Sequence, residues 1–197
     1  MHIHEGTVHL KSNNSKDAAG QQIYYTVLKA RGSDLMFMDE IEKKHFLDIL
    51  LGIRIRFKME VFAYCVLDGE AHILAGESQN EMQEQVWESL KKEFARYHEK
   101  MHGKNLLDIY YEISDAGVME DTQILAACIK MHMLPVVYKR VQQAEDYWWS
   151  SLKEYQLRYR SGIVLAGELL SCLDENHRIA ARMFRKLQNN VSTYINV

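Results

Sequence analysis

The strongest constraint on the fold is a pair of apolar runs, residues 61–67 and 71–75, separated by a turn that contains Asp68-Gly69. Apolar runs of this length joined by an Asp-Gly turn are typical of a β-hairpin. A single proline, Pro135, in a chain of 197 residues also favours long helices over a sandwich of many short strands. The sequence therefore predicts one hairpin within a chain that is otherwise rich in helix.

The segments around the hairpin alternate between strand and helix patterns. Residues 23–28 are rich in β-branched and aromatic side chains and predict a strand, and 106–113 predicts another. Apolar positions at helical spacing predict three helices, one opened by Asp39-Glu40, one over 81–102 and one over 121–133. Pro135 is expected to end the third helix.

The predicted order, β-α-β-β-α-β-α, indicates an α+β fold. Its first six elements match a ferredoxin-like β-α-β-β-α-β unit, an antiparallel sheet with helices on one face. Two further helices are expected over 162–172 and 174–190, with Asp174 as the N-cap of the second. We expect a mobile N-terminal arm (1–20), an α+β domain (21–150) and a helical C-terminal extension (151–197).

Charge and cysteine content exclude several classes of protein. A net charge of -3 and a pI near 6.3 exclude a histone-like basic protein, although a local basic surface remains compatible with them. The sequence has neither an apolar run of membrane-spanning length nor the pattern of a signal peptide. Its three cysteines form no C-x-x-C pair. A cytoplasmic protein with reduced thiols and no membrane partner is expected.

Three blocks of residues occur in a recognisable order. They are Tyr24-Tyr25-Thr26-Val27 with Ala30-Arg31-Gly32, Met131-His132-Met133-Leu134-Pro135-Val136, and Glu145-Asp146-Tyr147-Trp148-Trp149-Ser150-Ser151. Together they resemble the REP-associated tyrosine transposases of the single-tyrosine HUH nuclease superfamily. The resemblance implies a ferredoxin-like fold and single-stranded or hairpin DNA as partner.

The same resemblance identifies where the catalytic residues of the family would lie. Such transposases hold a divalent metal with two histidines one residue apart, and a tyrosine on a following helix attacks the phosphate. In this sequence, Glu70 and His72 occupy the histidine positions and Lys130 occupies the tyrosine position. A lysine cannot form a phosphotyrosine link. The resemblance therefore implies a transposase-like protein with no catalytic residue at the nucleophile position, acting as a DNA-binding or interaction module.

Two alternatives remain open at the level of sequence. Glu70 and His72 alternate onto one face of a strand, where a carboxylate and an imidazole could hold Mg²⁺ or Mn²⁺ in a residual single-stranded DNA nuclease. Tyr110, Tyr111 or Tyr138 could serve as a substitute nucleophile, and no spacing favours one of them. The second alternative is a structural protein that forms a homodimer and binds no DNA.

Basic residues suggest where DNA would bind. The predicted last helix places several cations on one face, where they would contact phosphates or form a solvated surface. Arg31 and Lys130 lie outside this helix and are added to the set. The predicted DNA-binding residues are Arg31, Lys130, Arg178, Arg182, Arg185 and Lys186.

A second metal motif competes with the transposase-like interpretation. Residues 98–102 match H-E-x-x-H, the zinc-peptidase pattern, with Glu120 as one candidate for a third ligand. The match ends at Gly103 and lies among charged residues, which favours a chance occurrence. His2, His4 and His9 could also bind a transition metal adventitiously from the N-terminal arm.

Overall fold

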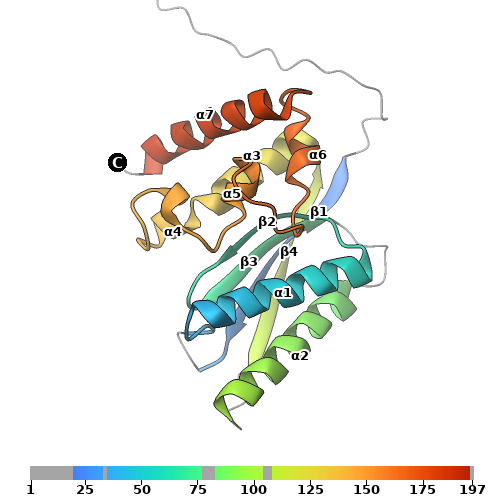
Figure 1. Ribbon diagram of the computed structural model, residues 1–197. Coiled ribbons are helices and arrows are strands. Elements are labelled where there is room, and N and C mark those ends of the chain that lie inside the picture. The colour runs from blue at the N-terminus through green and yellow to red at the C-terminus, as the bar shows by residue number, and fades with distance from the viewer. Residues whose placement is uncertain (1–19, 33–34, 77–82, 104–107, 196–197) are drawn as a thin grey trace, which may run out of the picture.

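The computed structural model describes residues 20–32, 35–76, 83–103 and 108–195 (Figure 1). Its centre is a four-stranded antiparallel sheet in the order β2-β3-β1-β4. The strands are β1 (Gln21–Ala30), β2 (Val61–Val66), β3 (Glu70–Gly76) and β4 (Ile109–Met119). The predicted hairpin is confirmed as β2 and β3, and the strand order is that of the predicted ferredoxin-like unit.

Helices α1 (Glu40–Phe57) and α2 (Gln83–His102) cover one face of this sheet. The helix opens at Asp39-Glu40, as its sequence predicts, and Asp39 is its N-cap, whose side chain accepts a hydrogen bond from the Glu42 amide. Phe46 of α1 and Phe94 of α2 meet edge to face with ring centroids 5.4 Å apart. Gly103 ends α2 with φ of +80°.

The helices after β4 cover the opposite face. Leu28 pairs with Tyr111, and the adjacent Val27 pairs with His72, so Tyr111 and His72 point to opposite sides of the sheet. Lys91 of α2 lies over the Tyr111 ring, whereas Tyr138 lies beside the His72 ring. Helices α3 (Asp121–His132) and α4 (Leu134–Val137) belong to this second layer, which buries β2 and most of β3 from both sides.

The C-terminal part is less regular than the sequence suggests. It contains a 3-10 turn, η1 (Ala144–Asp146), and helices α5 (Leu152–Tyr155), α6 (Ala166–Leu170) and α7 (His177–Ile195). The helix predicted over 162–172 is therefore only the five residues of α6.

Three predicted boundaries are corrected by the structure. Asn176, not Asp174, caps α7, because its Oδ1 accepts the amide hydrogen of Arg178 at 3.0 Å. The fourth strand runs to Met119, well beyond the predicted end at 113. Pro135 does not simply stop a helix, since α3 ends at His132 and the proline lies in the first turn of α4, where its missing N–H costs nothing.

Segments distant in sequence close the outer edge of β2. The Val66 and Ser151 amides donate to the Trp149 and Tyr64 carbonyls, at 2.8 and 3.0 Å, and the Leu165 amide donates to the Val61 carbonyl at 2.9 Å. The backbone of β2 is therefore already paired along this edge and is not free for strand addition by another chain.

The outer parts of the chain complete this description. Residues 1–19 of the predicted arm lie outside the described residues, and the division at residues 150 and 151 stays a prediction. No helix in the described part of the chain combines the length and apolar character needed to cross a membrane.

Candidate functional site

Glu70 and His72 lie at the centre of a cluster of polar side chains on the α3–α4 face of the sheet. They are alternate residues of β3, so their side chains project to the same side. His72 Nε2 lies 2.9 Å from Glu70 Oε1, and His72 Nδ1 lies 2.6 Å from the Tyr25 hydroxyl. The sequence-based prediction of a shared face is therefore confirmed.

Both nitrogens of His72 are engaged by neighbours. A neutral imidazole has one donor and one acceptor nitrogen. The carboxylate of Glu70 can only accept, so the Nε2–H donates to Glu70 and Nδ1 accepts from the Tyr25 hydroxyl. Burial lowers the pKa of His72, against the opposing effect of Glu70, and favours this neutral form.

Tyr138 completes the cluster from the second layer. It follows α4 directly, and its hydroxyl forms a hydrogen bond with Glu70. Its ring centroid lies 6.4 Å from that of His72, and the side chain is about half exposed. The hydrogen bond to Glu70, together with partial burial, raises the pKa of Tyr138 to about 12. The phenol is therefore harder to deprotonate, and so harder to activate as a nucleophile, than an ordinary tyrosine.

Lys29 supplies the positive charge next to this cluster. Its ammonium lies 3.4 Å from Glu70 Oε2 and 3.9 Å from Glu112 Oε2. Burial acts to raise the pKa of Glu70, but the hydrogen bonds from Tyr138 and His72 and the nearby Lys29 charge outweigh it and lower the pKa. The Glu70 carboxylate is thus ionised and already paired.

The donor set at Glu70 and His72 is a poor match for Mg²⁺ or Mn²⁺. Mg²⁺ requires octahedral oxygen coordination, and this cluster offers one carboxylate and one imidazole. The Lys29 ammonium also pairs with the second oxygen of Glu70 and would repel a divalent cation there. The chemistry these groups perform as arranged is to hold one another in place.

The predicted DNA-binding residues lie in three separate parts of the chain: the turn after β1, helix α3 and helix α7. Lys130 is exposed on α3, and among the described residues it has no ion pair. Arg31, just after β1, pairs with Asp108 at 3.6 Å and lies over the Tyr110 ring. The remaining four predicted cations are on α7.

Helix α7 is amphipathic and carries no acidic residue. Ala180 and Phe184 are fully buried, whereas Arg178, Arg182 and Lys186 are exposed at i, i+4 and i+8. Arg185 is partly buried and its Nε has no hydrogen-bond partner among the described residues. None of these four cations forms an ion pair with a described carboxylate. They form a row of positive charge, which we call the α7 basic row (Arg178, Arg182, Arg185 and Lys186).

A hollow of about 620 Å³ lies next to Tyr138 and was not predicted from the sequence. Lys139, Arg140, Gln142 and Gln143 provide its polar lining, with two valines. Arg140 also pairs with Asp68 of the hairpin turn at 3.3 Å. The signal that could have indicated this basic surface is the Lys139-Arg140 pair directly after the second block of the resemblance.

Comparison with solved structures relates this architecture to known proteins. A REP-associated tyrosine transposase bound to a REP hairpin is 17% identical, with a TM-score of 0.54, over 79% of this chain and 89% of that chain. The fold is transposase-like. The predicted family resemblance is thus confirmed in the fold. A candidate transposase from Deinococcus radiodurans R1 is 20% identical (TM-score 0.42), covering 60% of this chain and 97% of that chain.

Two further comparisons complete this result. A tRNA(His) guanylyltransferase from Saccharomyces cerevisiae is 8% identical with a TM-score of 0.43, over 88% of this chain and 80% of that chain. No protein-family profile matches the sequence, and no curated protein is similar to it. The transposase-like fold is therefore established by architecture alone, and the functional assignment has to come from the residues that this chain places on it.

Proposed function

We propose that this transposase-like protein is a DNA-binding module that recognises hairpin or single-stranded DNA through backbone phosphates and does not cleave it. The single observation that carries this proposal is the α7 basic row. A helix with four cations, no carboxylate and no ion pairs among the described residues is an electrostatic surface for phosphate.

Comparison with α2 supports the interpretation of the α7 basic row as a binding surface. Both helices carry four arginine and lysine residues, but α2 also carries four glutamates and α7 carries no acidic residue. Two cations of α2, Lys91 and Lys92, are held by Glu88. On a protein with a net charge of -3, such a local concentration of positive charge attracts phosphate in preference to a uniformly mixed surface.

The nature of the DNA is inferred from the fold. The transposase of similar architecture is bound to a REP hairpin. Because this chain shares the fold over most of its length, we propose a DNA hairpin as its ligand too. The Lys139 and Arg140 hollow offers a second phosphate-binding surface, beside the cluster that replaces the catalytic site.

Neutralising the α7 basic row tests this proposal. In the triple variant Arg178→Gln, Arg182→Gln, Lys186→Gln, we expect affinity for a labelled DNA hairpin to fall at least about tenfold at ~50 mM salt. The slope of log affinity against log salt should decrease by about 1 for each phosphate that the variant no longer binds. Fluorescence anisotropy over a salt series measures both quantities.

A matched control is provided by α2. Lys92, Arg96 and Lys100 are exposed at the same i, i+4 and i+8 spacing, and their change to glutamine removes the same charge. This control should bind like the wild type. An equal decrease in affinity in the two triple variants would mean that only net charge matters, and no binding by the wild type at ~50 mM salt would favour a structural or dimerising protein instead.

The absence of cleavage is a separate prediction. The resemblance places Lys130 at the position of the nucleophile. Tyr138, the one tyrosine of the predicted substitutes in the Glu70 cluster, has a raised pKa, so its phenol is harder to deprotonate than an ordinary tyrosine. We expect no covalent protein–DNA product when a single-stranded hairpin substrate is incubated with Mg²⁺ or Mn²⁺ and resolved on a denaturing gel. A product that disappears in Tyr138→Phe would establish Tyr138 as a nucleophile. A product that persists in this variant would mean that another group cleaves the DNA.

A further inference from the structure

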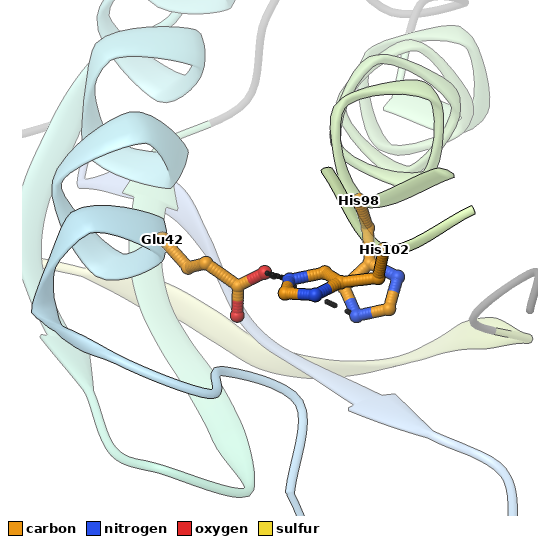
Figure 2. Close-up of side chains that lie close together, drawn as sticks. All are labelled: Glu42, His98 and His102. Carbon is orange, nitrogen blue, oxygen red and sulfur yellow. Dashed lines mark hydrogen bonds and ion pairs between the residues drawn. The ribbon is translucent and has the colours of Figure 1, made fainter. Parts of the chain in front are cut away.

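A second group of metal-binding side chains lies on the other layer, between α1 and α2. Glu42 projects from the first turn of α1 toward His98 and His102 on the last turns of α2 (Figure 2). The two histidines are the outer residues of the H-E-x-x-H pentapeptide. Their i and i+4 spacing places both imidazoles on one face of the helix, and their ring centroids are 4.5 Å apart.

The three side chains converge through single atoms. Glu42 Oε1 lies 2.6 Å from His102 Nε2 and 4.0 Å from His98 Nε2. One ligand atom from each residue lies within 4.8 Å of the other two. Tetrahedral zinc with bonds of 2.0–2.1 Å to nitrogen and oxygen places its ligand atoms about 3.3 Å apart. Shifts of about 1 Å in the side chains would bring all three to that spacing.

The Glu42 carboxylate is held in place by the backbone at the start of α1. Glu42 is almost fully buried, and its Oε2 accepts a hydrogen bond from the Met38 amide at 2.5 Å. The Glu42 amide in turn donates to Asp39, the N-cap. These contacts fix one oxygen on the backbone and leave Oε1 directed at the two imidazoles. Backbone donors of this kind orient metal-ligating carboxylates.

His98 gives an independent indication of a missing partner. Its side chain is only 7% exposed, and its Nδ1 is a buried polar atom with no hydrogen-bond partner among the described residues. Its Nε2 is 4.0 Å from Glu42, too far for a hydrogen bond. A buried ring nitrogen without a hydrogen-bond partner is costly. A metal ion bound to Nε2 would give this imidazole the partner that Glu42, at 4.0 Å, does not supply.

We propose that Glu42, His98 and His102 bind one Zn²⁺ ion that joins the start of α1 to the end of α2. Two imidazoles and one carboxylate are a ligand set that zinc uses in proteins, with water in the fourth position. His102 is 37% exposed, which gives the ion and the water a route to solvent.

The role of this zinc is to stabilise the helix pair. The third ligand is Glu42 rather than Glu120, whose side chain belongs to the capping box of α3. Glu42 and His98 are buried, so two of the three ligands lie between the helices rather than on the surface. The ion would therefore link two helices. A zinc bound only to folded protein raises the unfolding temperature by mass action.

Zinc titration of the full chain, stripped of metal by a chelator, tests the proposal. Calorimetry is expected to give one Zn²⁺ per chain, and added Zn²⁺ is expected to raise the unfolding temperature. Co²⁺ in the same site should give the visible absorption of a four-coordinate centre. His102→Ala, at a partly exposed position, should weaken binding at least about 100-fold and abolish the thermal shift. Glu42→Gln should act in the same direction while keeping an acceptor for Met38.

Two control variants separate this site from other histidines. His2, His4 and His9 changed together to alanine remove the adventitious ligands of the N-terminal arm, and His177→Ala removes an exposed histidine of α7. Both should bind zinc like the wild type. The proposal is overturned if binding survives His102→Ala and Glu42→Gln but is lost in the arm variant. It is also overturned if the stripped wild type binds no zinc, in which case Glu42 and His102 form an ordinary ion pair.

Discussion

Replacing Phe184 with alanine is expected to lower the free energy of unfolding by about 3–5 kcal/mol, the range for removing a fully buried aromatic side chain. Phe184 is the residue through which α7 enters the core. It is completely buried, stacks on Tyr155 with ring centroids 4.8 Å apart, and meets His132 edge to face at 6.0 Å. Urea unfolding followed by circular dichroism measures the decrease.

Leu187→Ala on the same helix is the matched control. Leu187 is 40% exposed, so its truncation should cost much less than that of Phe184. A single unfolding transition in the Phe184 variant would mean that α7 unfolds together with the sheet. A cost no larger than that of Leu187→Ala would contradict the packing. An early separate transition would instead support an independent C-terminal extension.

The fold was predictable where a local pattern determines an element. The hairpin follows from two apolar runs around Asp68-Gly69, and α1 follows from Asp39-Glu40 at its start with apolar residues at helical spacing. The C-terminal half was less predictable because its shape depends on long-range contacts. The Tyr155 hydroxyl donates to the Phe62 carbonyl, and Leu165 pairs with Val61, which leaves short elements where sequence alone suggests one helix.

The candidate sites divide in the same way. Strand alternation places Glu70 and His72 on one face, and helical spacing places His98 and His102 on another. Their partners come from elsewhere in the chain. Tyr25 is set by the pairing of β1 with β3, and Tyr138 is set by the chain after α4, where Lys139 adopts a positive φ of 55°.

Glu42 reaches the two histidines only because α1 packs on α2. Sequence motifs thus identify two residues of each site, Glu70 and His72 in one and His98 and His102 in the other. Packing and register, which no local pattern encodes, supply the residues that complete them.

Acid is expected to destabilise this protein through His132, the last residue of α3. Its side chain is fully buried against the C-terminal segment. Its Nε2 lies 2.8 Å from the Ser151 hydroxyl, and its Nδ1 has no partner among the described residues. Burial lowers its pKa from 6.5 to about 3. His132 therefore stays neutral in the folded state, while in the unfolded chain it takes up a proton as the pH falls below about 6.5.

The sign of the pH effect follows from this difference. Between about pH 6.5 and pH 3 the unfolded state binds the extra proton, so the free energy of unfolding decreases as the pH falls, by up to about 1.4 kcal/mol for each pH unit. By about pH 4 the decrease due to His132 is on the order of 3 kcal/mol. Glu70 and His72, whose pKa values are also lowered, add to the decrease in the same direction.

His132→Gln isolates the contribution of this one residue. Glutamine does not titrate, and its amide can reach toward Ser151, so the variant should be less stable than the wild type near neutral pH but lose less stability as the pH falls. Urea unfolding at several pH values from about 7 to 4 gives the two slopes. His177→Gln, at an exposed position, is the control and should follow the wild type. Equal slopes in His132→Gln and the wild type would mean that the His132 imidazole is protonated as readily in the core as in water.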